Sequence, residues 1–165
     1  MIILKRFQLS DITKEYISWI NDKSLFQFSK HRKKYYTKDS AIKFYKELKK
    51  NKDYFFVIIK KEKNLYIKIG TLIGRINKKK DCDLSILIIK QKKGYGLAAF
   101  KKAIKFFFKK NIKAITGGTL ANNIGMLKIF KKSGMKLKYK KFKKFEHFDN
   151  KKLIVHYYIK NPKTK

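Results

Sequence analysis

Residues 83–109 constrain the fold of this chain more than any other stretch. Residues 84–89 are almost continuously aliphatic, with a charged side chain at each end of the run. Such a run is too short for a typical helix, and it predicts a strand that is buried on both faces. Residues 91–96 form a basic turn with two glycines, and residues 97–109 carry apolar side chains at helical spacing. The sequence therefore predicts a buried strand, a glycine-bearing turn and a helix in direct succession.

The turn at 91–96 is a candidate binding site for an anion. The free N–H groups at the start of the helix and the positive end of its dipole favour a phosphate there. Gly94 and Gly96 allow the backbone to approach a ligand closely, and Lys92 and Lys93 add positive charge. The alternative is an ordinary strand-to-helix turn with a solvated charged rim. The turn lacks the third glycine of a dinucleotide fingerprint and the Gly-Lys-Ser/Thr of a Walker P-loop.

Three motifs resemble the GNAT acetyltransferase superfamily. The Gln-Lys-Lys-Gly-Tyr-Gly at 91–96 resembles the family's acyl-CoA signature, Arg/Gln-x-x-Gly-x-Gly/Ala, which follows its fourth strand. Residues 121–135 resemble a later block, Asn-x-x-Ser/Ala with an aromatic residue and Lys-x-Gly-Phe. Residues 16–22 resemble the Trp-x-Asn-Asp helix of the branch that includes ribosomal-protein N-terminal and amino-sugar acetyltransferases. Together the resemblance covers almost the whole chain, and the three motifs follow one another along it at 16–22, 91–96 and 121–135.

The expected fold is a mixed α/β (α+β) fold in a single GNAT-like domain over residues 1–165. Periodicity alone indicates α+β or α/β. The resemblance implies a central, twisted, mostly antiparallel sheet of about seven strands with helices on both faces. The expected order is β-α-α-β-β-β-α-β-α-β-β, and residues 160–165 are expected to be a frayed tail.

The expected elements follow from apolar periodicity and capping residues. Strands are expected at 2–7, 54–60, 66–76, 84–89, 113–119, 136–145 and 153–159. Ser10-Asp11 is expected to cap a helix at 12–21, and Thr37 or Asp39 a helix that runs to about residue 50. Asn122 or Asn123 is expected to cap a helix that runs to 132 and ends at Gly134 in a left-handed conformation.

The net charge of +34 admits two interpretations. One is binding to nucleic acid or to an anionic membrane. The other is drift in an A/T-rich genome, which we favour because Arg6, Arg32 and Arg75 are the arginines among 45 basic residues, and arginine is the preferred residue for phosphate recognition. We therefore expect neither specific nucleic-acid binding nor a membrane partner.

A single cysteine, Cys82, excludes an intrachain disulfide and a cysteine zinc cluster, and no metal is expected. The chain has no apolar run of the ~20 residues that a membrane span needs. It has no signal-peptide pattern at its start. These features predict a cytoplasmic location.

The resemblance implies that acetyl-CoA is the co-substrate. The amides of 92–97 would hold its pyrophosphate, and the edge of strand 84–89 would pair with the pantetheine amides where two central parallel strands splay apart. Asn123 would either bond the pantetheine or cap its helix. The residues expected at the acetyl-CoA site are Leu87, Ile88, Ile89, Gln91, Lys92, Lys93, Gly94, Tyr95, Gly96, Leu97, Asn123 and Phe130.

The expected reaction is direct attack of an amine on the bound thioester. The N–H of Ile88 or Ile89 is the candidate donor to the thioester carbonyl. Asp83 is the candidate base, the alternative being an exposed strand carboxylate. Phe130 stands where many relatives place a tyrosine that protonates the leaving thiolate, and Met126 stands at the Ser/Ala position. His147 and His156 are interpreted as sheet or surface residues.

The segment 22–36 is expected to lie over the acceptor site. Its candidate acceptor contacts are Phe28, Ser29, His31, Arg32 and Tyr36, with Arg32 suited to a phosphate or carboxylate and His31 alternatively an exposed loop residue. The predicted function is N-acetylation of a small amine acceptor, in particular a nucleotide-linked amino sugar or a similar metabolite. The alternatives are a ribosomal-protein N-terminal acetyltransferase, a basic nucleic-acid-binding module, and a CoA-binding regulator without catalysis. A homodimer is left open.

Overall fold

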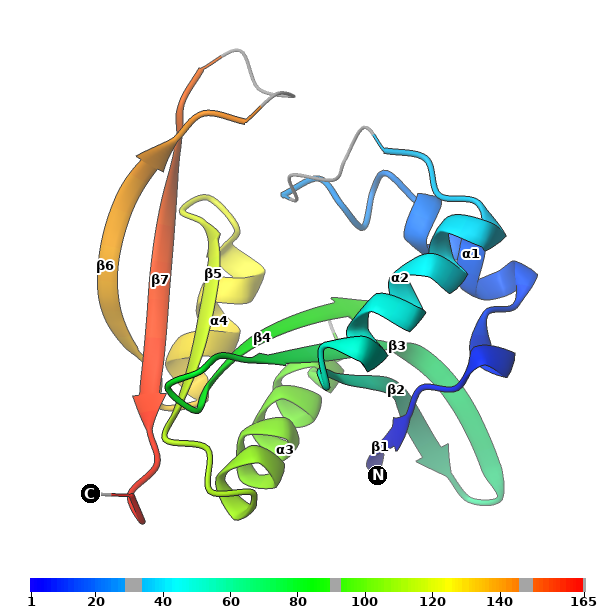
Figure 1. Ribbon diagram of the computed structural model, residues 1–165, viewed down its shortest axis with the longest axis horizontal. Coiled ribbons are helices and arrows are strands. Elements are labelled where there is room, and N and C mark those ends of the chain that lie inside the picture. The colour runs from blue at the N-terminus through cyan, green and yellow to red at the C-terminus, as the bar shows by residue number, and fades with distance from the viewer. Residues whose placement is uncertain (29–33, 90–92, 146–149, 165) are drawn as a thin grey trace.

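Seven strands form one sheet in the computed structural model, which describes residues 1–28, 34–89, 93–145 and 150–164. The spatial order is β1-β2-β3-β4-β5-β7-β6, and each neighbouring pair is antiparallel except β4 and β5 (Figure 1). The strands are β1 (Ile2–Arg6), β2 (Tyr54–Glu62), β3 (Leu65–Ile76), β4 (Asp81–Ile88), β5 (Ala114–Leu120), β6 (Lys136–Lys143) and β7 (Lys152–Lys160).

Helices cover both faces of this sheet. On one face, called the front here, lie α1 (Lys14–Asn21) and α2 (Lys38–Lys50), with a short 3-10 helix, η1 (Leu9–Asp11), before them (Figure 1). On the back lie α3 (Tyr95–Lys109) and α4 (Ile124–Lys132). The expected mixed α/β fold and the expected order of helices and strands are confirmed. Within the described residues, none of these helices has the length and apolar character that a membrane crossing requires.

The sheet separates two hydrophobic cores, and β2 contributes to both. Its alternating side chains Phe55, Val57 and Ile59 pack on the front against α1 and α2, whereas Phe56 and Ile58 pack on the back against α3. All five are at most 9% exposed. Because both faces are covered, β2 reads as a continuous apolar run and fixes the centre of the fold.

The two parallel strands, β4 and β5, part soon after they begin to pair. Their ladder consists of three pairs, Asp81–Ala114, Cys82–Ile115 and Asp83–Thr116. Just beyond it, a Cβ at Gly117 would lie 2.8 Å from the ring of Phe130, a residue of α4 that is 1% exposed and stacks on Tyr157. The glycine thus lets an aromatic ring occupy the back of the opening between the strands, which we call the gap.

The gap explains why one prediction for β4 is wrong. The strand is not buried on both faces, since Cys82 and Leu84 are buried on the back but Asp83 and Ser85 are exposed on the front. Helices α1 and α2 lie over β2 and β3 and leave the front of β4 uncovered. The sequence pattern shows that the strand is apolar, but it does not show that the front of β4 lacks a covering helix.

The capping predictions are confirmed with one exception. The side chains of Thr37 and Asn123 cap α2 and α4, and Gly134 adopts a left-handed φ of 81° after α4. The exception is α1, whose cap is Thr13, because the hydroxyl of Thr13 accepts the N–H of Tyr16 at 3.2 Å. Asp11 instead accepts the N–H of Gln8 and pairs with Lys68 at 2.7 Å.

The start of the C-terminal tail is fixed rather than frayed. Asn161 is 2% exposed, and its side-chain amide donates to the carbonyls of Phe108 and Ile112 at 3.1 and 3.0 Å. Its backbone N–H donates to Lys113 at 2.8 Å. Asn161 therefore ties the end of β7 to the turn between α3 and β5.

Candidate active site

The first turn of α3 presents unpaired backbone amides. Gly94 precedes the helix with a left-handed φ of 73°, and its carbonyl accepts the first helical bond, from Ala98, at 3.2 Å. The amides of Tyr95, Gly96 and Leu97 come before that bond and have no acceptor within the helix. A Cβ at Gly94 would meet no atom within 4 Å, so the backbone faces open space there. Lys93 is exposed beside it, whereas Gln91 and Lys92 lie outside the described residues.

This turn lies next to the gap. A Cβ at Gly96 would lie 3.0 Å from Ile129 of α4 and 3.6 Å from Ile88 of β4. The start of α3 is thus wedged between the end of β4 and the helix that follows β5. An anion held by the α3 amides would be positioned at the back entrance of the gap.

Alternate backbone groups of β4 point into the gap. The carbonyl of Leu84 lies 3.5 Å from where a Gly117 Cβ would be, so it faces β5. Because backbone direction alternates along a strand, Ile86 and Ile88 also present their N–H and C=O groups to the gap. The N–H of Ile89 donates to Ile69 at 3.0 Å, and the carbonyl of Leu87 faces Gly70 of β3. Of the two predicted donors to the thioester carbonyl, Ile88 remains available and Ile89 does not.

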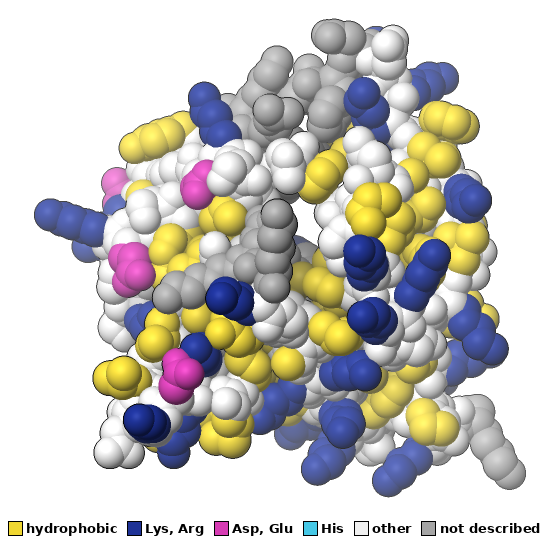
Figure 2. Space-filling view, turned by 180° about the vertical axis from the view of Figure 1, so that it is seen from behind, with side chains coloured by type: hydrophobic (Ala, Val, Ile, Leu, Met, Phe, Trp, Pro, Cys, Tyr) yellow, Lys and Arg dark blue, Asp and Glu magenta, His cyan; other side chains and the backbone are white. Residues whose placement is uncertain are grey.

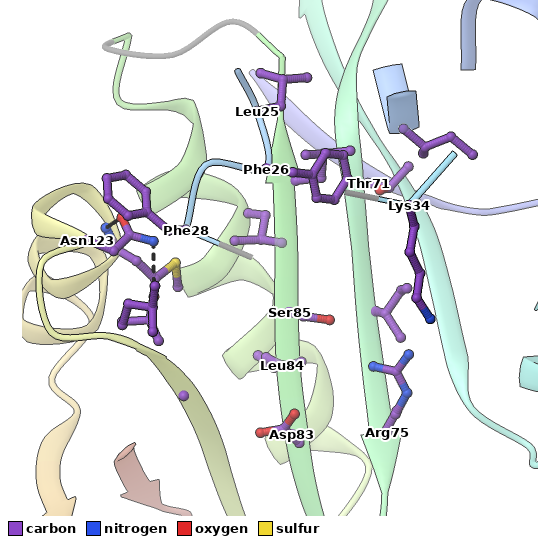
Figure 3. A pocket seen from close by; sticks show the side chains of 18 of the residues that line it. Leu25, Phe26, Phe28, Lys34, Thr71, Arg75, Asp83, Leu84, Ser85 and Asn123 are labelled. Atoms are coloured by element: carbon purple, nitrogen blue, oxygen red, sulfur yellow. Dashed lines mark hydrogen bonds between the residues drawn. The ribbon is translucent and has the colours of Figure 1, made fainter. Parts of the chain in front are cut away.

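A cavity of about 780 Å³ passes through this region. Figure 2 shows a hollow between the half of the molecule that carries β1–β4 and the half that carries β5–β7. In Figure 3, Asp83, Leu84 and Ser85 follow one another along β4, with Arg75 on the neighbouring strand and Asn123 across the gap. The predicted site residues Phe28, Tyr36, Leu87 and Phe130 also line this cavity.

Asp83 lies at the point where the two strands part. It occupies the last paired position, and Thr116 Oγ1 of β5 donates to its Oδ1 at 3.2 Å. Desolvation by the surrounding protein raises the pKa of Asp83, although the Thr116 hydrogen bond and the Arg75 charge act in the opposite direction. Arg75 is its partner in the β3–β4 ladder. The structure therefore places a carboxylate at the front mouth of the gap.

The family model for the acetyltransferase (GNAT) domain matches residues 2–136. The chain belongs to the GNAT acetyltransferase family. This confirms the predicted superfamily and, with it, the prediction of an acyl-CoA-dependent N-acetyltransferase that uses acetyl-CoA.

Solved GNAT-like structures share the fold over nearly the entire chain. Spermidine N-acetyltransferase from Vibrio cholerae, in complex with CoA and spermine, has a TM-score of 0.85 at 16% identity over 97% of this chain and 95% of that one. A Salmonella typhimurium protein, with its cofactor acetyl-CoA, has a TM-score of 0.78 at 12% identity, over 99% of this chain and 95% of that one. Ribosomal-protein-alanine N-acetyltransferase from Brucella melitensis has a TM-score of 0.77 at 10% identity, over 96% of this chain and 99% of that one. No curated protein sequence matches the chain significantly.

Two residues of the GNAT motif on α4 are engaged within the protein. The side chain of Asn123 accepts the N–H of Met126 at 3.2 Å and donates to the hydroxyl of Thr119 at 3.0 Å. Of the two roles predicted for Asn123, the structure shows the helix cap, and a pantetheine contact stays a prediction. Phe130 packs between Phe100 and Tyr157. It offers no proton to a leaving group.

Asn21, the asparagine of the Trp-x-Asn-Asp motif, holds the two ends of the segment 22–36 together. The side-chain amide of Asn21 donates to the carbonyl of Tyr36 at 2.8 Å and accepts its N–H at 2.8 Å, as a neighbouring strand would. This pairing joins the end of α1 to the residue just before the α2 cap. The predicted contacts Phe28 and Tyr36 line the cavity, and burial raises the pKa of Tyr36. Ser29, His31 and Arg32 lie outside the described residues.

His156 of β7 is a cavity residue that the sequence analysis interpreted as a sheet or surface residue. It pairs with Gly118 of β5 on one side and with Tyr139 of β6 on the other. Alternation along 153–159 could have placed it on the face opposite the buried Val155 and Tyr157. Nothing in the sequence reveals that the neighbouring strand carries a glycine at that register.

The described part of the cavity wall is strongly basic. Lys34, Arg75, Lys141 and Lys143 line it, and Asp83 is the one carboxylate among its described lining residues. Lys34 and Arg75 lie to the same side of β4 in Figure 3, and Lys141 and Lys143 belong to β6 across the gap. No cluster of three or more metal-ligating His, Cys, Asp or Glu side chains occurs within the described residues.

Proposed function

We propose that this GNAT enzyme acetylates the primary amine of a small acceptor that also carries negative charge, such as a nucleotide-linked amino sugar. The observation that carries the proposal is the basic wall around a single described carboxylate. Cations on both sides of the cavity attract phosphate or carboxylate groups. A polyamine acceptor such as spermine would meet like charges at the same positions, which disfavours it.

Acetyl-CoA would enter from the back of the sheet. The amides of Tyr95, Gly96 and Leu97 support a pyrophosphate at the start of α3, with Gln91, Lys92 and Lys93 beside them in the sequence. The free edge of β4 at Ile86 and Ile88 supports pairing with the pantetheine amides, as an added strand would. The thioester then lies in the gap alongside β4, between the carboxylate of Asp83 at the front mouth and the N–H of Ile88 farther along the strand.

The acceptor would enter from the front. Its amino group would bind next to Asp83, whose carboxylate attracts the ammonium form into the gap. Its anionic part would lie among Lys34, Arg75, Lys141 and Lys143, with Arg32 a further predicted contact, together with Ser29 and His31. The thiolate leaves without a tyrosine because a thiol with a pKa of about 8.5 needs little protonation.

The test is an acceptor panel with acetyl-CoA, monitored by release of the CoA thiol. The panel contains a nucleotide-linked amino sugar, the same amino sugar without the nucleotide, spermidine, and a peptide with an N-terminal alanine. We expect kcat/KM for the nucleotide-linked sugar to exceed that for the free sugar by about tenfold or more, equivalent to about 1.4 kcal/mol. Preference for spermidine or for the peptide would overturn the proposal, and the peptide result would favour the N-terminal acetyltransferase branch.

A further inference from the structure

The imidazole of His156 lies against the floor of the cavity beside the gap. A Cβ at Gly118 would lie 2.8 Å from its Cε1 and 2.9 Å from its Nδ1, so the ring covers the strand that borders the gap. On its other side, Tyr139 stacks on the ring with centroids 4.4 Å apart and 23° between the planes. Gly118 directly follows Gly117, which faces the Leu84 carbonyl across the gap. The ring is therefore fixed in orientation, close to the place where the thioester would lie.

One nitrogen of this ring has no partner. Nε2 of His156 is buried, and no described group forms a hydrogen bond with it. Buried polar atoms are normally paired, because an unpaired one carries a desolvation penalty of about 1–3 kcal/mol. An unpaired nitrogen in the wall of a ligand cavity indicates an atom that forms its hydrogen bond with a bound ligand or that receives a proton during the reaction.

Burial and the neighbouring lysines both disfavour the protonated form of the ring. Burial lowers the pKa of His156, and the positive charges of Lys141 and Lys138 on β6 lower it further. Strand β6 also presents Tyr139, whereas β5, on the other side, has no charged side chain (Ala114–Leu120). Asp83 of β4 carries the one carboxylate among the described residues of the cavity wall. A neutral imidazole at pH 7 has a free lone pair and is a stronger base than a carboxylate.

We propose that His156, held between Gly118 and Tyr139, accepts the proton of the acceptor amine during acetyl transfer. The inference rests on the proposed function only in requiring an amine acceptor in the front of the cavity. The bound ammonium first releases one proton to water; as the resulting amine nitrogen forms its bond to the thioester carbon, a further N–H proton passes to the imidazole. The C–S bond breaks, the thiolate of CoA leaves with the electron pair, and the imidazolium returns its proton to the thiolate or to water. Asp83 attracts the amino group, and His156 deprotonates it.

The test compares His156→Gln with wild type, using whichever amine of the acceptor panel the wild-type enzyme acetylates. We expect kcat at pH 7.5 to fall about 100-fold or more, as loss of a general base does, with CoA affinity unchanged. In wild type, kcat should fall as the pH drops through the lowered pKa of His156 and the imidazole becomes protonated, and this limb should be absent in His156→Gln. Tyr158→Phe, on the same face of β7 but outside the cavity wall, is the matched control and should behave as wild type.

A second measurement does not depend on how the variant folds. The Cε1–H resonance of His156 in the wild-type protein should titrate below the ordinary histidine pKa of about 6.5, and it should shift when the acceptor is added but not with CoA alone. The inference is overturned if His156→Gln retains the wild-type pH profile, or if the resonance titrates normally and does not respond to acceptor. Failure of the acceptor panel with anionic amines alone would overturn the proposed function and leave this inference standing on another amine.

Discussion

Asp83 has different consequences for stability and for activity. Its pKa is raised, chiefly by desolvation, so the folded state favours the protonated carboxyl more than the unfolded chain does. The stability that this group contributes is therefore complete at low pH and is lost as the pH rises through its folded-state pKa. A carboxylate kept ionised in this position at neutral pH favours function over stability.

We therefore expect Asp83→Asn to melt at the same temperature as wild type or higher at pH 7. The difference should vanish below about pH 3.8, where the carboxyl is protonated in both states. In acetylation assays the acceptor KM should rise about tenfold, because the ammonium group loses its counter-charge, while CoA affinity and the acidic limb of kcat should persist. Loss of that limb in Asp83→Asn would identify Asp83, and not His156, as the base.

The sequence best predicts single residues that act on their own backbone. Thr37, Asn123 and Gly134 follow from local capping chemistry and were predicted. His156 and Gly118 acquire meaning only from the register of β5 and β7, which no local pattern contains. The basic cavity wall likewise combines Lys34, from the segment 22–36, with Lys141 and Lys143 of β6, which lie about a hundred residues later in the chain.

At the scale of elements, the succession from β4 through the glycine turn to α3 was predictable because period and glycine placement change abruptly there. The parting of β4 and β5 was expected from the resemblance alone, since it depends on how Phe130 packs against Gly117. The start of α1 was misplaced because Ser10, Asp11 and Thr13 are all acceptable caps, and the ion pair with Lys68 removes Asp11 from that role. Tertiary contacts decided between local alternatives.

The α3 turn provides a test of the CoA site. In Gly94→Val, the side chain would occupy the open space over the α3 amides, and a left-handed φ costs a non-glycine residue about 1–2 kcal/mol. We expect CoA affinity to fall more than tenfold, measured by calorimetric titration. Gly134→Ala is the control, because its φ of 81° imposes similar strain after α4. It should lower the melting temperature comparably but leave CoA affinity unchanged; an unaffected Gly94→Val would remove this turn from the site.

At the scale of the whole molecule, the charge of +34 is distributed over much of the surface. Lys and Arg side chains are spread over the face shown in Figure 2, most densely on the half that carries β5–β7. All eight residues of β6 are exposed, and five of them are lysines. Such a distribution supports attraction to any polyanion, whereas a specific nucleic-acid site needs contacts that read bases or shape.

We therefore expect the protein to bind single-stranded oligonucleotides at 50 mM salt and to release them by 200 mM, with no preferred sequence. Counterion release from a single strand makes the affinity fall by about 300-fold over this range if some six phosphates are neutralised. Fluorescence anisotropy with oligonucleotides of different sequence measures both properties. The same salt increase should lower acetylation of a nucleotide-linked amino sugar far less, because charges within a partly enclosed cavity are screened less than surface charges. Tight, sequence-dependent binding at 200 mM would instead favour a dedicated nucleic-acid surface, and would mean that the lysines reflect selection for a polyanionic partner.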